Sequence, residues 1–241
     1  MKNKTINTTD NKSGRESEKI KIALVGNPNV GKSCFFNHFS GVYVDVSNFP
    51  GTTVSISKCD YKEYEIYDTP GVYGVSSFNE EEKVARDIIL EADRVINIVN
   101  SLHLERDLFL TLQLIDMGKK VSVVLNFCDE LQKRKIKIDV KKLSSLLGVE
   151  VFETTAVDKK GFENLDDAIE KAGQGNKSSE LQNSINNFLD ITKDQSTALL
   201  LLEGDFEAVD KFGSVENIAE NREKVYISRR IRVNEIVDQV E

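Results

Sequence analysis

The chain has 241 residues, of which 39% are hydrophobic and 30% charged, enough for one domain of moderate size or one domain with an appendage. Its formal net charge of −8 argues against nucleic-acid binding through bulk electrostatic attraction, and no apolar run is long enough to span a bilayer. Cys34, Cys59 and Cys128 are widely spaced, which is typical of a reducing cytoplasm and of free thiols that are buried or half-buried.

The first informative segment is a phosphate-loop pattern. Residues 1–18 are polar and predict a disordered leader, and the apolar run IKIALV at 20–25 predicts a buried strand. GNPNVGKS follows at 26–33 and leads into a helix that reaches about Phe39. Glycines let backbone N–H groups turn toward phosphate oxygens, Lys32 would reach the β- and γ-phosphates, and the Ser33 hydroxyl would ligate Mg²⁺. The alternative is a glycine-rich turn with an incidental lysine, which the flanking strand and helix disfavour.

A second motif follows a predicted hairpin. Residues 41–53 form an irregular stretch, and alternating residues at 54–59 and 64–67 predict two antiparallel strands. The second strand runs into DTPG at 68–71. Asp68 is thereby placed where the Mg²⁺ shell needs a carboxylate, and Gly71 lets the backbone pivot toward a γ-phosphate.

The remaining segments alternate between helical and extended patterns. Helices are predicted at 80–90, 105–117, 140–147 and 162–172, and strands at 94–99, 120–125 and 149–152. This alternation predicts an α/β class, with a P-loop fold whose mostly parallel sheet of six or seven strands is flanked by helices. From about residue 180 the apolar residues keep helical spacing, so we expect a nucleotide-binding domain at 19–173 and an all-helical appendage of three or more helices at 174–241.

The segment NFCD at 126–129 decides between nucleotides. A carboxylate at Asp129 can accept both the N1–H and the 2-amino group of guanine, whereas adenine offers neither donor there. Asn126 is expected to brace the loops, and a backbone N–H of Thr155 or Ala156 is expected to support the guanine O6. The order of the motifs favours GTP and GDP.

These motifs resemble those of the translation-factor-related GTPases. Longer stretches, NFPGTTV, DTPGVYGVSSFNEEEKVARD, LERDLFLTLQLIDMG and LLEGD, resemble the cytoplasmic part of the ferrous iron transport protein B family. The resemblance covers most of residues 20–205, and the tail is similar to the helical domain of that family. It implies a GTPase that regulates Fe²⁺ uptake on the cytoplasmic face of the inner membrane, with a membrane-embedded iron-transport domain, absent here, as partner. No nucleic-acid partner is expected, and a homo-oligomer is left open.

The motifs and the resemblance together assign roles to individual residues. Nucleotide contacts are expected from Asn27, Asn29, Val30, Gly31, Lys32, Ser33, Cys34, Asp68, Gly71, Asn126, Asp129, Thr155 and Ala156. Catalytic roles are expected of Lys32, Thr53 and Gly71, and Mg²⁺ ligation of Ser33, Thr53 and Asp68.

Hydrolysis is expected to be slow and to be stimulated by potassium. Val72 stands where Ras-like enzymes carry a water-orienting glutamine, and no arginine occupies an obvious finger position. Asn29 is therefore expected to hold K⁺, as in related GTPases with asparagine at this position, and the alternative is that its side chain only hydrogen-bonds the loop backbone. The run Glu80–Glu82 predicts an acidic helix start rather than an iron site. Two alternatives stay open, a ribosome- or tRNA-linked GTPase and a nucleotide-binding interaction module with negligible turnover.

Overall fold

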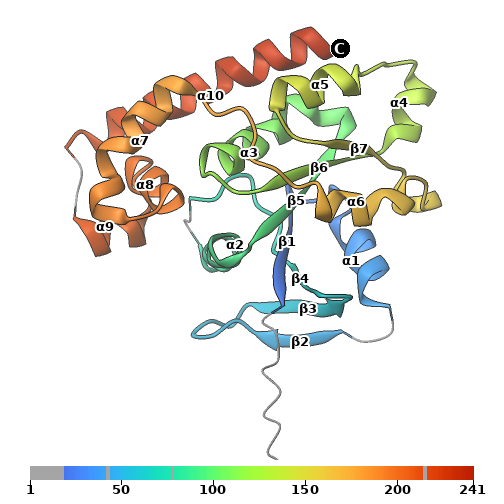
Figure 1. Ribbon diagram of the computed structural model, residues 1–241, viewed down its shortest axis with the longest axis horizontal. Coiled ribbons are helices and arrows are strands. Elements are labelled where there is room, and N and C mark those ends of the chain that lie inside the picture. The colour runs from blue at the N-terminus through green and yellow to red at the C-terminus, as the bar shows by residue number, and fades with distance from the viewer. Residues whose placement is uncertain (1–18, 42–43, 77–78, 214–215) are drawn as a thin grey trace, which may run out of the picture.

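The protein is described by a computed structural model that covers residues 19–41, 44–76, 79–213 and 216–241, so the leader predicted at 1–18 lies outside the described residues. Within these ranges seven strands form one sheet in the order β2-β3-β4-β1-β5-β6-β7 (Figure 1). The strands are β1 (Ile20–Gly26), β2 (Asp45–Asn48), β3 (Ser55–Tyr61), β4 (Tyr64–Asp68), β5 (Arg94–Asn100), β6 (Val121–Asn126) and β7 (Val151–Glu153). Among the described strands the pairs β2–β3 and β3–β4 are antiparallel and the other four pairs are parallel, which confirms a mostly parallel sheet.

Helices alternate with the strands and then continue alone. The α-helices are α1 (Lys32–Ser40), α2 (Glu80–Glu91), α3 (Leu104–Asp116), α4 (Cys128–Arg134), α5 (Val140–Leu147), α6 (Leu165–Glu170), α7 (Ser179–Thr192), α8 (Gln195–Leu202), α9 (Phe206–Phe212) and α10 (Ile218–Val240). Short 3₁₀ helices are η1 (Ser101–His103), η2 (Ala156–Asp158) and η3 (Phe162–Asn164).

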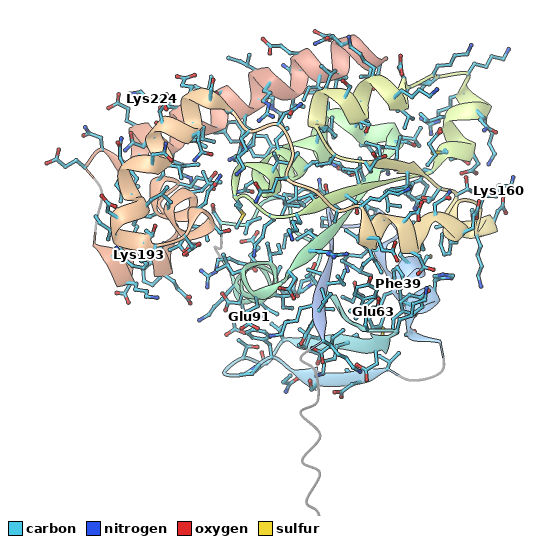
Figure 2. The ribbon with its side chains drawn as sticks, viewed as in Figure 1. Phe39, Glu63, Glu91, Lys160, Lys193 and Lys224 are labelled. Carbon is cyan, nitrogen blue, oxygen red and sulfur yellow. The ribbon has the colours of Figure 1, made fainter. Side chains whose placement is uncertain are left out.

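Side chains of the central strand β1 alternate between the two covered faces of the sheet. Ile22 and Leu24 pack in the cluster formed with α1 and α6, whereas Ala23 and Val25 pack with α2 and α3. Figure 2 shows Phe39 of α1 among the side chains between this helix and the sheet. Because both faces are covered, residues 22–25 of β1 are all apolar, and each fully buried large aliphatic side chain contributes about 1.5–3 kcal/mol.

The carboxyl ends of the parallel strands meet at one edge of the sheet. β1, β4, β5 and β6 end at Gly26, Asp68, Asn100 and Asn126, and Asn100 lies directly opposite Asn126 in the register. Ligands of open α/β sheets bind outside such an edge. The motifs identified in the sequence are therefore brought to the same end of the molecule.

Besides the short 3₁₀ helices, one strand and one α-helix were not predicted from the sequence. The stretch 41–53, expected to be irregular, contains β2, whose four residues are polar or small apart from Val46 and of which three are exposed. The helix α4 was also not predicted, because only Cys128 and Leu131 of its seven residues are buried and the apolar period is too short to detect.

The C-terminal part is helical, as predicted. Helix α10 runs over α3 and α5 (Figure 1), and the backbone N–H of Asp139 donates to the carbonyl oxygen of Val240 over 2.8 Å. Arg229 of α10 is buried and donates to Glu203 over 2.7 Å. Among the described residues no helix is both long and apolar enough to cross a membrane. The boundary between residues 173 and 174 stays a prediction.

Candidate nucleotide-binding site

The loop between β1 and α1 has the backbone geometry of a phosphate cradle. Asn29 and Gly31 have positive φ angles of 66° and 88°, and Val30 between them is buried. A Cβ atom on Gly31 would lie 2.7 Å from the Nδ2 atom of Asn126, so glycine is required there both by φ and by space. The helix α1 begins at Lys32, and the first N–H groups of a helix have no intrahelical acceptor. The loop therefore presents donors and the positive helix end to the same point.

This loop lines a cleft of about 480 Å³. The lining residues are Asn27, Pro28, Asn29, Val30, Gly31, Lys32, Ser33, Cys34, Gly71 and Glu81. Gly71 arrives from the segment after β4, where a Cβ atom would lie only 3.0 Å from the Cα atom of Pro28. The glycine of DTPG thus allows the backbone to pass directly against the phosphate loop.

A second cleft of about 830 Å³ adjoins the first and shares Gly71 and Glu81 with it. Thr53 and Asp68 line this second cleft. The Thr53 hydroxyl donates to Oε2 of Glu80 over 3.3 Å, so this threonine lies beside the start of α2 rather than in the phosphate-loop cleft.

Lys32 and Asp68 form an ion pair between the two motifs. Their side chains are only 11% and 17% exposed, so both charges lie at the base of the site and not on the open surface. An ammonium, a carboxylate and the exposed hydroxyl of Ser33 converge here. This donor set suits a phosphate group together with a hard divalent cation such as Mg²⁺.

Asn126 joins the phosphate loop to the loop after β7. Its Nδ2 donates to the carbonyl oxygen of Val30 and its Oδ1 accepts from the N–H of Ala156, each over 3.0 Å. The side chain is 1% exposed. The predicted bracing role of Asn126 is confirmed.

Asp129 lies half-buried at the start of α4. Lys133 donates to its Oδ2 over 3.0 Å, and this hydrogen bond lowers the pKa of Asp129. The group is therefore a carboxylate at neutral pH, which is the form that accepts from two donors of a guanine base.

The expectation that a backbone N–H of Thr155 or Ala156 supports a base oxygen stays a prediction, and in this structure both N–H groups donate to the protein itself. The N–H of Thr155 donates to the carbonyl oxygen of Lys160 over 3.0 Å, and that of Ala156 donates to Asn126. Both donors already have protein acceptors. The next N–H of the loop belongs to Val157, whose side chain is 81% exposed.

The residue after Gly71 supplies no polar side chain. Val72 is 1% exposed and belongs to the apolar core, while its N–H donates to the carbonyl oxygen of Gly26 over 3.1 Å. The Val72 side chain therefore offers no group that could orient a water molecule.

The cysteines differ in burial, which corrects the expectation for one of them. Cys59 and Cys128 are buried, and burial raises the pKa of each thiol to about 11. Cys34 is exposed, because it is in the first turn of α1 on the side that lines the cleft.

Glu81 is a site residue that the sequence analysis missed. The acidic run was interpreted as a helix start, and α2 does begin at Glu80, with the Asn79 side chain accepting from the N–H of Glu82 over 2.9 Å. In addition, Glu81 lines both clefts. Its distance in sequence from the phosphate loop hides this proximity, and an acidic residue soon after DTPG is the only signal for it.

The ordered phosphate loop, DTPG segment and NFCD segment, all at the carboxyl ends of parallel strands, define a P-loop GTPase fold. A family model described as ferrous iron transport protein B matches residues 20–169. The chain belongs to this family, which confirms the resemblance noted in its sequence.

Relatives with solved structures cover nearly all of the chain. It is similar to the cytosolic domain of T. maritima FeoB in a GDP form, with 31% identity, a TM-score of 0.80, and coverage of 92% of this chain and 98% of that one. The cytosolic domain of L. pneumophila FeoB gives 30% identity, a TM-score of 0.79, and coverage of 91% and 98%. The match extends through the helical part of the fold.

The curated relatives are longer proteins. The Fe(2+) transporter FeoB of Helicobacter pylori is 44% identical over 145 residues, which are 58% of this chain and 23% of that protein. That of Campylobacter jejuni is 39% identical over 152 residues, 61% of this chain and 25% of that protein. The chain thus spans about a quarter of the length of these relatives.

Proposed function

We propose that this chain binds GTP and GDP, hydrolyses GTP slowly, and thereby regulates ferrous iron uptake by a membrane-embedded domain of a longer protein. The observation that carries the proposal is the bracing of Val30 and Ala156 by Asn126, beside the carboxylate of Asp129. One side chain fixes the phosphate-binding loop and the base-binding loop relative to each other. The proposed place of action is the cytoplasmic face of the inner membrane.

Guanine would be read by Asp129 and by the loop after β7. The carboxylate accepts from N1–H and from the 2-amino group, and the N–H of Val157 is the donor we assign to the O6 atom. Adenine in the same position would leave a carboxylate facing an acceptor, which is unfavourable.

Phosphates would be held by the loop N–H groups and by Lys32, whose charge is neutralised by Asp68 in this structure. Ser33, Thr53 and Asp68 are the residues that would hold Mg²⁺, which neutralises the charge that phosphoryl transfer develops on the phosphate oxygens. The chain's own contribution is to position the phosphates and to limit access of water. Because Val72 is buried in the core, no side chain at its position activates the water, and a slow rate follows.

The specificity of the site is tested by displacement of a fluorescent GDP analogue. Unlabelled GTP and GDP should displace it, whereas ATP at the same concentration should not, because Asp129 pairs with guanine alone. Turnover of GTP to GDP and phosphate is measured on the same preparation. Equal displacement by ATP and GTP contradicts the assignment of Asp129, and GDP binding without turnover favours an interaction module.

Potassium should raise GTP turnover about tenfold relative to sodium, with Asn29 as a ligand. The side chain of Asn29 is exposed at the cleft and makes no hydrogen bond among the described residues, so its oxygen is available to a cation. A cation between the phosphates would stabilise the negative charge that develops on the phosphate oxygens during hydrolysis, a task that an arginine performs in other GTPases. Asn29→Ala should remove the gain and leave GDP affinity nearly unchanged.

Asn37→Ala is the matched control for the potassium experiment, because Asn37 is exposed on α1 and does not line the cleft. This variant should keep the full potassium effect. Equal turnover of the wild type in potassium and sodium buffers would rule out the cation site.

A further inference from the structure

The first turn of α3 contains the segment LERD at 104–107. None of these four residues has a role in the nucleotide-binding site proposed above. Asp107 is 2% exposed and lies in the buried stripe of the helix between Leu104 and Leu108. A carboxylate in an apolar stripe needs several donors to be tolerated. Its partners therefore indicate what it does.

The Asp107 carboxylate connects the phosphate loop to the end of β5. Its Oδ1 accepts from Nδ2 of Asn27 over 2.8 Å, and its Oδ2 accepts from the backbone N–H of Asn100 over 2.9 Å. Arg106 donates to Oδ1 through Nε over 2.7 Å and supplies the opposite charge. The helix α3 thus fastens the beginning of the phosphate loop to a neighbouring strand.

Asn27 is the member of this cluster that reaches the cleft. Its side chain is 2% exposed, it lines the phosphate-loop cleft, and its Oδ1 is buried with no hydrogen-bond partner among the described residues. The hydrogen bond to the carboxylate fixes the amide, since only its NH₂ group can face Asp107. Pro28, the next residue, is in close contact with Gly71. A shift of Asn27 would therefore displace the phosphate loop at Pro28, where the backbone of Gly71 packs against it.

We propose that Asp107 is a positioning residue for phosphate binding, which acts by holding Asn27 and with it the start of the phosphate loop. Asp107 itself does not line the phosphate-loop cleft. The proposal rests on the nucleotide-binding function proposed above, and it adds a residue of α3 to the determinants of nucleotide affinity.

A double-mutant cycle with GDP affinity as the readout tests this role. Asp107→Asn preserves volume but removes the charge and cannot accept from all three donors, so the Kd for GDP should rise about tenfold. In the Asn27→Ala background the same substitution should change Kd less than about twofold, because the amide through which it acts is gone. A role in general stability would give the same loss in both backgrounds.

The matched control is Asp116→Asn in the same helix. Asp116 is also 2% exposed, but it accepts from Ser178 and Arg232 of the C-terminal part instead of the phosphate loop. This variant should lower the melting temperature and leave the Kd for GDP within about twofold of the wild type.

The outcomes separate this inference from the proposed function. If the wild type binds no GDP, the proposed function fails. If the wild type binds GDP and Asp107→Asn binds it equally well, or if the losses are equal in both backgrounds, the positioning role is overturned. Should Asp107→Asn not fold, Asn27→Ala alone decides, since an unchanged GDP affinity in that folded variant also overturns the role.

Discussion

Asp129→Asn is expected to raise the Kd for GDP and GTP about 10³-fold. The carboxylate would accept two donors of guanine, whereas an amide would offer one acceptor oxygen and turn its NH₂ group toward the second donor. Each lost hydrogen bond to a charged group costs about 1.5–3 kcal/mol, and roughly 4 kcal/mol in total corresponds to this factor. Xanthosine nucleotides should bind this variant more tightly than guanosine nucleotides, because their 2-oxo group accepts from the new amide.

Glu130→Gln is the control for this substitution. Glu130 is adjacent to Asp129, lies in the same helix, and accepts from the same lysine, Lys133, over 2.6 Å. The control variant removes one negative charge nearby without changing a base contact, so its Kd for GDP should stay within about twofold. Equal losses in the two variants would show that local charge, and not base pairing, sets the affinity.

The phosphate loop was predictable because its signal is local. The strand before Gly26, the spacing to Lys32 and the helix after Ser33 are all contained in one short segment, and the backbone angles at Asn29 and Gly31 follow from it. Asn126 was placed correctly at the end of β6 for the same reason, and Asp129 follows in the first turn of α4. Buried parallel strands appear in the sequence as apolar runs, so the positions of these strands along the chain were also predictable.

Contacts between distant segments could not be predicted in this way. The N–H of Ala156 was assigned to the base, but its acceptor is Asn126 in another loop. Nothing in the local pattern distinguishes a free donor from one that a remote side chain already uses. The hydrogen bond between Asn27 and Asp107, 80 residues apart, escaped for the same reason.

The contacts of the helical part with the nucleotide-binding part are a further example. Glu203, which follows α8, accepts from the hydroxyl of Ser76 and from Gln113, each over 2.6 Å. Arg86 of α2 is 2% exposed and donates to both carboxylate oxygens of Asp205. The sequence predicted helices in this part and assigned no role to their polar residues. In the structure, the carboxylates of Glu203 and Asp205 are buried against α2, α3 and the segment after DTPG.

Thr53→Ala is expected to reduce GTP turnover about 100-fold and to change the Kd for GDP less than about twofold. In this structure the Thr53 hydroxyl donates to Glu80 at the start of α2, and Thr53 lines the cleft that Asp68 and Gly71 also line. Because Glu80 is exposed, the hydrogen bond from the Thr53 hydroxyl to its carboxylate can be broken at little cost in free energy. The hydroxyl would then be free to ligate Mg²⁺ when GTP is bound. GDP has no γ-phosphate, so its binding does not draw on this threonine, and single-turnover hydrolysis together with GDP titration separates the two effects.

Thr52→Ala is the matched control, and it decides between a switch role and a folding role for Thr53. The Thr52 hydroxyl donates to the carbonyl oxygen of Phe49 over 3.1 Å and accepts from the N–H of Val54 over 3.2 Å, so it only holds the loop together. Its loss should loosen the loop and reduce turnover by a much smaller factor, because the Thr53 hydroxyl is still present. If Thr52→Ala and Thr53→Ala reduce turnover equally, or if Thr53→Ala weakens GDP binding as much as it slows hydrolysis, Thr53 belongs to the framework of the loop. A loss confined to the triphosphate reaction in Thr53→Ala alone identifies its hydroxyl as a group that acts only when the γ-phosphate is present.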